Sequence, residues 1–217
     1  MSVFRPFRYI SKLEIEATAL DIWLQISRSQ GEIQLPIDAS IIAEFLGLDL
    51  VWDSIAEDEQ GAIAARILPL EKLIEINENI PQLKGGFGES TIAHEIGHWV
   101  LHIDTEQVER FIRLQQKGMN VRVKPFLCRS SNLARIEWQA QYFAGCLLMP
   151  QHILTRLKQD KNLTRWQHLY QMAQELGVTI SNLTTRLQDL GWIYVDSDTR
   201  QISVERSYKN MYPNNIN

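Results

Sequence analysis

The stretch "STIAHEIGHWVLH", residues 90–102, contains three of the five histidines of the 217-residue chain, spaced four residues apart. Each residue of an α-helix advances by about 100° around the axis, so residues four apart lie on nearly the same face. His94, His98 and His102 would therefore share one face, with Glu95 at its edge. The pattern predicts a helix with one face in a core and one face available for chemistry. The opposite, apolar arc consists of Ile92, Ile96, Trp99, Val100 and Ile103.

The composition is that of a soluble globular protein, with 45% hydrophobic and 22% charged residues. No apolar run approaches the roughly 20 residues that cross a bilayer, and the N-terminus lacks the apolar stretch of a signal peptide. Two cysteines, Cys128 and Cys146, are too few for a disulfide framework. We therefore expect a cytoplasmic protein without a membrane partner.

Charge is distributed unevenly along the chain, although the formal net charge is only −4. Residues 1–102 are acidic, whereas residues 103–135 form a basic insert. An acidic first half argues against general binding to nucleic acid. The basic insert suits either a solvated surface loop or an acidic partner.

The remaining sequence alternates helical and extended patterns. Strands are expected over 48–53 and on both sides of a turn at 69–72, and 121–128 reads as extended. Helices are expected over 9–30, 39–47, 105–118 and 132–149, and Ser90 is a candidate N-cap of the histidine helix.

The last part of the chain is helical and separable. "LYQMAQELGVTISNLTTRLQDLG" resembles a helix-turn-helix, with its turn at Gly177 and a second helix that opens at Ser181 and presents Asn182, Thr185 and Arg186. We divide the chain into a domain over 1–150, a helix-turn-helix-like region over 151–195 and a C-terminal tail over 196–217.

The motif His-Glu-x-x-His on a helix places two imidazoles within reach of one metal ion, beside a glutamate that can hold a water. His94, Glu95 and His98 match this motif. The alternative is a helix whose histidines are simply solvated. A catalytic zinc site usually needs a third protein ligand and leaves one position for water.

Three candidates exist for that third ligand. His102 lies about 12 Å along the axis from His94, too far for side chains on one straight helix to converge. A cysteine would suit a structural site better. Glu137 lies on a second strong helix, at the edge of its apolar stripe, where a buried carboxylate needs a partner. Without a metal, Glu137 would form an ion pair with Arg135 or face solvent.

"TIAHEIGHWVLH" followed by "EWQAQYFAGCLLMP" closely resembles the ImmA/IrrE family of bacterial metallopeptidases, and the resemblance extends over roughly residues 13–195. It implies an α+β, zincin-like fold and a Zn²⁺ ion held by His94, His98 and Glu137, with Glu95 as the catalytic residue. The usual asparagine of the second motif is Gln141 here. His102 also matches a family histidine, to which we assign no direct role in metal binding.

The resemblance further implies a substrate, since characterised relatives relieve repression by cutting a helix-turn-helix transcriptional repressor. An unselective cytoplasmic peptidase would be toxic, so we expect selectivity from residues 103–135 and 151–195. A substrate strand would pair with an exposed sheet edge, for which "LIEIN" (73–77) is the candidate. No oxyanion-stabilising group is identified.

Two rival functions remain. One is a DNA-binding regulator with a structural metal, although a structural zinc site usually has four protein ligands and the recognition helix has little positive charge around it. The other is an interaction module that uses the peptidase-like fold without cutting its target.

Overall fold

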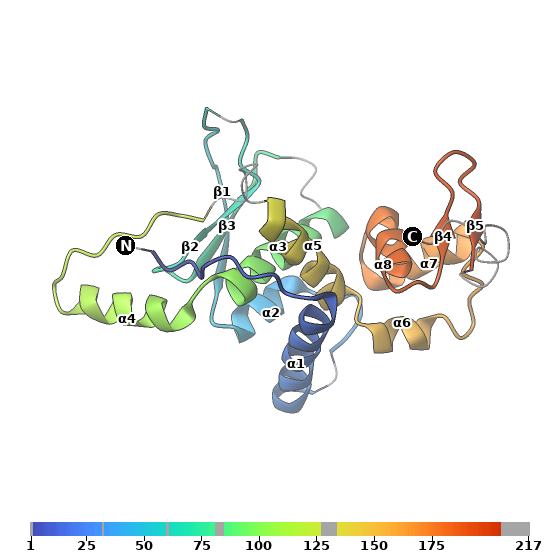
Figure 1. Cartoon of the computed structure of the whole chain (residues 1–217), viewed down its shortest axis with the longest axis horizontal. Helices are drawn as coiled ribbons and strands as arrows, with labels where there is room; N and C mark the ends of the chain where they lie inside the picture. The colour runs from blue at the N-terminus through green and yellow to red at the C-terminus, as the bar shows by residue number, and fades with distance from the viewer. Residues whose placement is uncertain (1, 32, 60, 81–84, 127–133, 205–217) are drawn as a thin grey trace.

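The computed structural model describes residues 2–31, 33–59, 61–80, 85–126 and 134–204, and Figure 1 shows its elements. The fold is α+β, as expected from the sequence. The strands are β1 (Asp49–Asp53), β2 (Ala65–Leu68), β3 (Leu73–Asn77), β4 (Tyr194–Val195) and β5 (Ile202–Ser203). The helices are α1 (Lys12–Gln30), α2 (Ala39–Phe45), α3 (Gly86–His102), α4 (Thr105–Gln116), α5 (Ala134–Leu148), α6 (Gln151–Leu157), α7 (Trp166–Leu176) and α8 (Ile180–Asp189).

The main sheet has three strands in the order β1-β3-β2. β1 runs parallel to β3, with Leu50 opposite Ile74, and β2 runs antiparallel to β3, with Ile67 also opposite Ile74. The strand "LIEIN" is therefore the central strand, and the expectation that it offers a free edge is wrong. Both faces of β3 are covered, because four of its five positions are buried.

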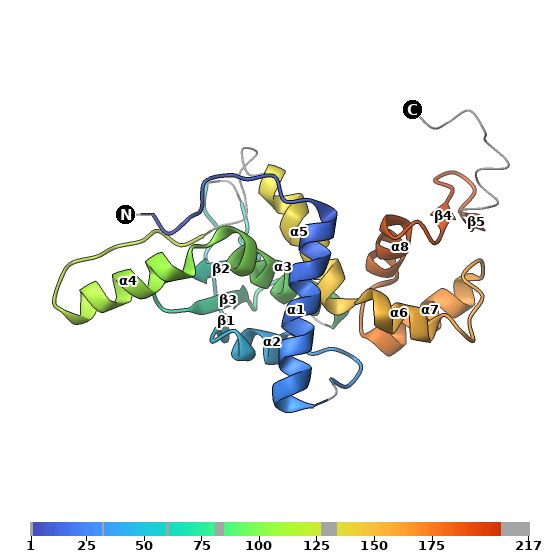
Figure 2. The ribbon, with the colours of Figure 1, turned by 60° about the horizontal axis from the view of Figure 1, so that its bottom comes forward.

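The core lies between the sheet and the helices α1, α2, α3 and α5. α3 packs against β2, β3 and α2, and α5 packs against both α3 and α1. Ile92 and Ile96 of α3 are buried in this core together with Ile67 and Ile74 of the sheet. Figures 1 and 2 show α4 projecting at one end of the molecule and the C-terminal helices at the other.

α3 begins earlier than the sequence suggested. Its N-cap is Gly85, so Ser90 lies inside the helix and donates a hydrogen bond to the carbonyl of Gly86 (2.9 Å). Gly86 leaves no room for a side chain, because a Cβ there would lie 2.6 Å from the carbonyl oxygen of Gly177. The turn between α7 and α8 therefore rests directly on the start of α3, which the single-helix pattern did not reveal.

The C-terminal region contains the expected helix-turn-helix geometry. α7 ends at Gly177, and α8 begins at Ile180 with Thr179 as its N-cap, one residue before the predicted start. A hairpin of β4 and β5 follows, so residues 202–203 form a strand where the sequence predicted a tail. Asp196 closes this hairpin by accepting hydrogen bonds from the backbone of 198 and 199, a turn that reads only as polar loop in the sequence.

Residues 121–126, which the sequence predicted as extended, do not form a strand of the sheet. Their one bridge pairs Phe126 with Ile67, and residues 127–128, including Cys128, lie outside the described part of the chain. Within the described residues, no helix is long and apolar enough to span a membrane.

Candidate metal centre

The histidine face of α3 lies against α5, where His94 contacts Glu137 and His102 contacts Gln139. His98 and His102 are buried and His94 is half-buried, while Ile96 and Trp99 on the opposite arc pack into the core. The amphipathic division expected from the sequence is therefore present.

α5 can approach α3 closely because small residues meet at the contact. A Cβ on Gly97 would lie 3.0 Å from both the Cα and the carbonyl oxygen of Ala140. On α5, Glu137 lies three residues before Ala140. On α3, Gly97 lies directly before His98. The close contact between the two helices therefore places the carboxylate of Glu137 beside the imidazoles of His94 and His98.

The structure brings the three expected ligands together. Oε2 of Glu137 lies 3.1 Å from Nε2 of His94 and 3.6 Å from Nε2 of His98. The two Nε2 atoms lie 3.0 Å apart. Among the described residues, His94, His98 and Glu137 are the one group of three or more metal-ligating side chains that could hold an ion.

These distances fit a zinc ion. Four ligands at zinc–nitrogen and zinc–oxygen bond lengths of about 2.0–2.1 Å occupy tetrahedral corners roughly 3.3 Å apart. The three observed separations, 3.0, 3.1 and 3.6 Å, scatter around that value. In addition, Oε1 of Glu137 is buried without a hydrogen-bond partner in the described structure. A carboxylate oxygen in that state is costly unless a cation is nearby.

Electrostatics favour ionised Glu137 and neutral His98. Burial alone would raise the pKa of Glu137, but the neighbouring imidazoles of His94 and His98 outweigh burial and lower that pKa to about 2. Burial, together with the neighbouring histidines, lowers the pKa of His98 to about 4. Burial also opposes protonation of His94, yet Glu137 and Glu95 together raise its pKa. A carboxylate and a neutral imidazole are the forms that bind metal.

A hydrogen-bond chain behind the cluster fixes the orientation of His98, and the sequence alone did not identify it. Buried Gln139 donates from Nε2 to the carbonyl of Arg8 (3.1 Å), which turns its Oε1 toward Nε2 of His102 (2.9 Å). Because a carbonyl oxygen can only accept, Nε2 of His102 must donate.

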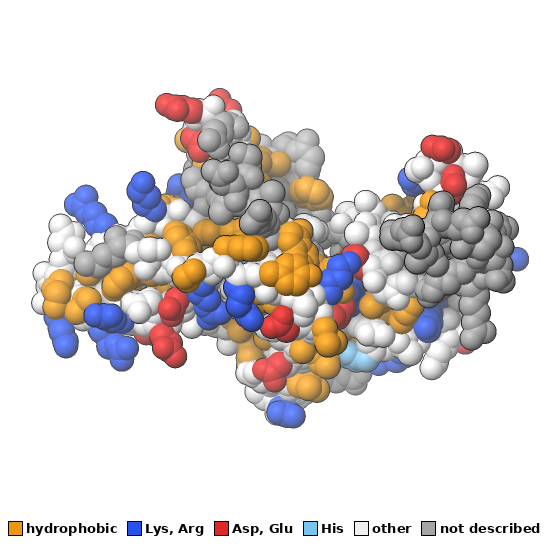
Figure 3. Space-filling view, in the orientation of Figure 1, with side chains coloured by type: hydrophobic (Ala, Val, Ile, Leu, Met, Phe, Trp, Pro, Cys, Tyr) orange, Lys and Arg blue, Asp and Glu red, His pale blue; other side chains and the backbone are white. Residues whose placement is uncertain are grey.

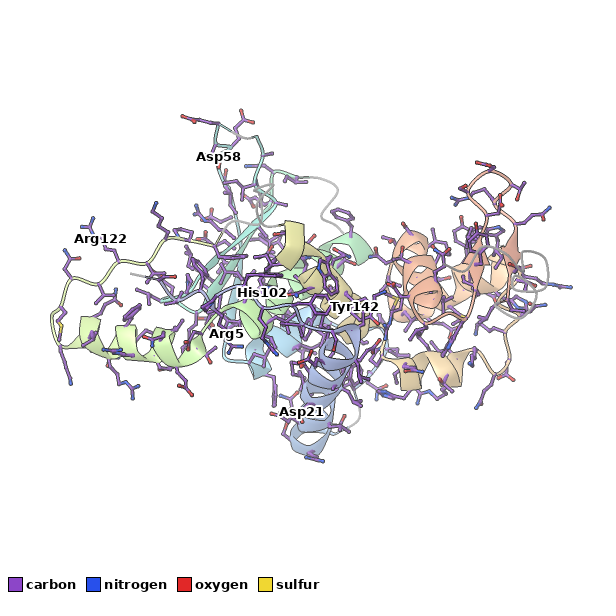
Figure 4. All side chains as sticks on the ribbon, in the orientation of Figure 1. Arg5, Asp21, Asp58, His102, Arg122 and Tyr142 are labelled. Carbon is purple, nitrogen blue, oxygen red and sulfur yellow. The ribbon has the colours of Figure 1, made fainter. Side chains whose placement is uncertain are left out.

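The same reasoning extends the chain of hydrogen bonds to the metal ligands. With its proton on Nε2, neutral His102 offers Nδ1 as an acceptor, 3.0 Å from Nδ1 of His98. His98 then carries its proton on Nδ1 and directs the free lone pair of Nε2 toward Glu137 and His94. His102, at the centre of the molecule in Figure 4, thus lies behind His98 in this chain of hydrogen bonds.

The cluster opens into a hollow of about 310 Å³, named here the metal-site hollow. Glu95, which is 3% exposed, lies on its wall with His94 and Glu137. The other walls come from residues 62–65 at the start of β2, from Phe87, Ser90 and Thr91 of α3, from Gln141 of α5 and from Asn182 of α8. A buried carboxylate therefore lines the same hollow as the candidate ligands.

Cys146 plays no part in this centre. It is buried on the far side of α5, and its burial raises the pKa of its thiol well above the usual range. Glu16 and Arg186 lie close enough to Cys146 to influence that pKa. The side chain of Arg135, the alternative partner of Glu137, lies outside the described residues.

Two polar residues of α8, Asn182 and Arg186, are engaged with neighbouring helices. Arg186 is 2% exposed and donates from Nη1 and Nη2 to the two carboxylate oxygens of Glu16 (2.5 and 2.9 Å). Asn182 donates to the hydroxyl of Ser90. Two of the three residues that a recognition helix would present to DNA are therefore engaged with α1 and α3.

Comparison with known proteins identifies the family of the chain. Residues 64–188 match the Peptidase_M78 family, described as the IrrE N-terminal-like domain. The match covers more than half of the chain, and the chain belongs to this peptidase family. No curated protein matches the chain.

A solved structure with a similar chain is a transcriptional regulator from Mycobacterium tuberculosis. Its sequence identity is 16% and its TM-score is 0.49, and the match covers 88% of this chain and 55% of that chain. The present chain thus spans about half the length of that regulator. At this level of similarity, no conclusion about function follows.

Proposed function

We propose that the protein is a zinc-dependent metalloendopeptidase that cuts one specific protein, a helix-turn-helix transcriptional repressor, and thereby relieves repression. The observation that carries the proposal is the convergence of His94, His98 and Glu137 beside Glu95 in one hollow. Membership of a peptidase family supports the same reaction.

His94, His98 and Glu137 would hold the zinc ion. When bound, zinc lowers the pKa of a water toward about 7 and polarises a carbonyl group. Glu95 takes the proton of the attacking water and passes it to the nitrogen of the leaving amine. Its burial keeps bulk water away from that proton, and its position beside His94 puts it within the same hollow as the ligands.

The peptide would lie against the outer side of β2. Residues 62–65 line the metal-site hollow, and β2 is an edge strand of the main sheet. An extended peptide can add to such an edge through backbone hydrogen bonds. Further along the strand, the bridge between Ile67 and Phe126 already covers β2. The substrate would therefore pair with the start of β2, which corrects the assignment to 73–77.

Selectivity would come from contacts beyond the cut bond. Figure 3 shows Lys and Arg side chains along α4 and the segment after it, and exposed members include Arg110, Arg113, Lys117 and Lys124. This basic surface would attract an acidic region of the target.

The inward-facing residues of α8 weigh against the DNA-binding alternative. Arg186 cannot reach a base or phosphate while it pairs with Glu16, and Asn182 is committed to Ser90. Direct readout needs side chains that reach the base edges. The remaining alternative, an interaction module without catalysis, differs from the proposal only in whether Glu95 matters.

The test uses purified regulators encoded beside this chain. Incubation with the zinc-loaded protein should give two fragments by mass spectrometry, and Glu95→Gln should slow the cut by about 10²–10⁴-fold while keeping the metal. Unfolded casein should stay intact. Cleavage by Glu95→Gln at the wild-type rate would exclude the mechanism, and rapid digestion of casein would exclude the selectivity.

A further inference from the structure

A second cavity, named here the side cavity, continues from the metal-site hollow. Its volume is about 400 Å³. The two spaces share Ser90 of α3, Gln141 of α5 and Asn182 of α8 as lining residues. They are therefore neighbouring parts of one groove, whose floor is α5.

The length of this groove suits an extended peptide. Its floor runs along α5 from Glu137, through Gln141 and Gly145, to Met149, so one helical face lines it throughout. These twelve helical steps span about 18 Å, the length of roughly five residues of an extended strand. The middle of the side cavity thus lies about three peptide residues from the metal ligands.

The lining of the side cavity is mainly apolar. Trp138, Tyr142, Leu148 and Met149 contribute from α5 or directly after it, and Gly145 leaves the floor open. The hydroxyl of Tyr142 already donates to Glu16 (2.9 Å), so its polar end is satisfied outside the cavity. A bulky apolar group would gain most from such walls.

The charged side chains around the cavity are paired with one another. Nζ of Lys12 lies 2.6 Å from Oδ1 of Asp189, and Arg186 forms its two-pronged pair with Glu16. A charged side chain that entered the cavity would lose water and find these charges already neutralised. The cavity therefore discriminates against charge.

α8 forms the wall opposite α5 and places Thr185 at the cavity. Thr185 is exposed, unlike the neighbouring Arg186, and it lies one turn beyond Ser181, which lines neither cavity. The helix-turn-helix-like region would thus contribute to peptide recognition with the face that a DNA-binding protein turns to DNA.

We propose that the side cavity binds a bulky, uncharged apolar or aromatic side chain of the substrate, about three residues from the cut bond, and that Thr185 of α8 helps to set this preference. The inference rests on the proposed peptidase function for its catalytic meaning. The binding itself can be measured without catalysis.

The binding test observes the methionine methyl groups of the full chain by ¹³C NMR, since only five methionines are present. Met149 lines the cavity, whereas Met172 is buried in α7 and serves as the internal reference. The probes are N-acetyl amides of leucine, phenylalanine, aspartate and lysine. The apolar amides should shift the Met149 signal saturably, and the charged ones should bind roughly tenfold more weakly or not at all.

Two blocking variants and one control sharpen the result. Thr185→Trp fills the cavity from α8 and Gly145→Leu fills it from α5, so both should abolish the Met149 shift. Ser181→Trp adds the same indole one turn away and should keep it. When the substrate is the regulator that the protein cuts, Thr185→Trp should raise KM about tenfold with kcat unchanged.

The outcomes separate this inference from the proposed function. If Met149 does not respond to apolar amides, or if Thr185→Trp leaves KM unchanged, the side cavity is not a substrate site, although the peptidase function can still stand. If Met149 responds and both blockers remove the response while no regulator is cut, the apolar site is established and the peptidase function fails.

Discussion

Two buried polar clusters lie along α5, and they differ in how completely their members are paired. At the start of the helix, Glu137 meets His94 and His98, and Oε1 of Glu137 has no hydrogen-bond partner in the described structure. Near the middle, where α1, α5 and α8 meet around Tyr142 (Figure 4), Glu16 pairs with Arg186 through both oxygens.

The difference separates a candidate metal site from a structural ion pair. The Glu16–Arg186 pair receives a further hydrogen bond from Tyr142, and Nε of Arg186 donates to the carbonyl of Met149 (3.2 Å). Nothing in that cluster calls for a ligand. The histidine cluster combines an unpaired oxygen, close-set donor atoms and an adjoining hollow, and a cation would complete it.

The largest effect on stability should come from breaking the Glu16–Arg186 ion pair. Arg186→Met leaves Glu16 half-buried without its cation and should lower the free energy of unfolding by about 3 kcal/mol. Urea denaturation followed by circular dichroism measures this loss. Lys12→Met breaks the more exposed Lys12–Asp189 pair and should lower the free energy of unfolding by less than about 1 kcal/mol.

The same variant also tests how independent the two clusters are. Arg186→Met should retain zinc in the folded protein, because none of the three candidate ligands contacts Arg186. Loss of zinc from folded Arg186→Met would show that the clusters are coupled and that their separation is wrong.

The second prediction concerns the chain of hydrogen bonds behind His98. Gln139→Leu keeps a similar volume but removes the acceptor of His102, so the tautomer and orientation of His98 are no longer fixed. Zinc affinity should fall by about 10–100-fold, as for other residues that support metal ligands. Competition with a chromophoric chelator measures this, and unchanged affinity would assign Gln139 a packing role only.

A third prediction uses two glycines as a matched pair. Both Gly97 and Gly145 are helical, so alanine gains the same helix propensity at each. At Gly97 the new methyl meets the backbone of Ala140 at 3.0 Å, whereas at Gly145 it meets the Cδ of Arg186 at 3.6 Å. Gly97→Ala should cost about 1 kcal/mol by parting α3 from α5.

Because that movement separates Glu137 from the histidines, Gly97→Ala should also weaken zinc binding. Gly145→Ala should be neutral or slightly stabilising and should leave zinc affinity unchanged. Equal zinc affinities in the two variants would show that the close contact does not position the ligands.

The smallest effect is a dependence of stability on pH through Glu16. Burial raises the pKa of Glu16, but Arg186 and Tyr142 outweigh it, so the folded pKa lies below the ordinary 4.5. The stabilisation is therefore present above pH 4.5 and is lost as the pH falls through the folded pKa. The difference in urea midpoint between wild type and Glu16→Gln should shrink on acidification below pH 4.5, and a constant difference would contradict this role.

Much of this arrangement was predictable from local patterns. Helical spacing placed His94, His98 and His102 on one face of α3, and the turn at 69–72 predicted the strands β2 and β3 on either side of it. Glu137 became a candidate through its position at the edge of an apolar stripe, and in the structure Ala140 on the same helix permits the close contact with Gly97.

Long-range pairings could not be predicted from these patterns. Gln139 looks like an ordinary helix residue until its contacts with Arg8 and His102 are known. Arg186 reads as a DNA-facing residue until Glu16, 170 positions earlier, turns it inward. The order of strands, with 73–77 in the centre, likewise depends on pairings between distant segments.

The most direct test of the account is the zinc content of the purified full chain. Elemental analysis should give about one zinc per chain for the wild type, as expected for one site with three protein ligands. His98→Ala and Glu137→Ala should each lose most of that zinc, while Lys12→Met keeps it. Full zinc occupancy in folded Glu137→Ala would remove Glu137 from the site and contradict the assignment of the α3–α5 contact as the metal centre.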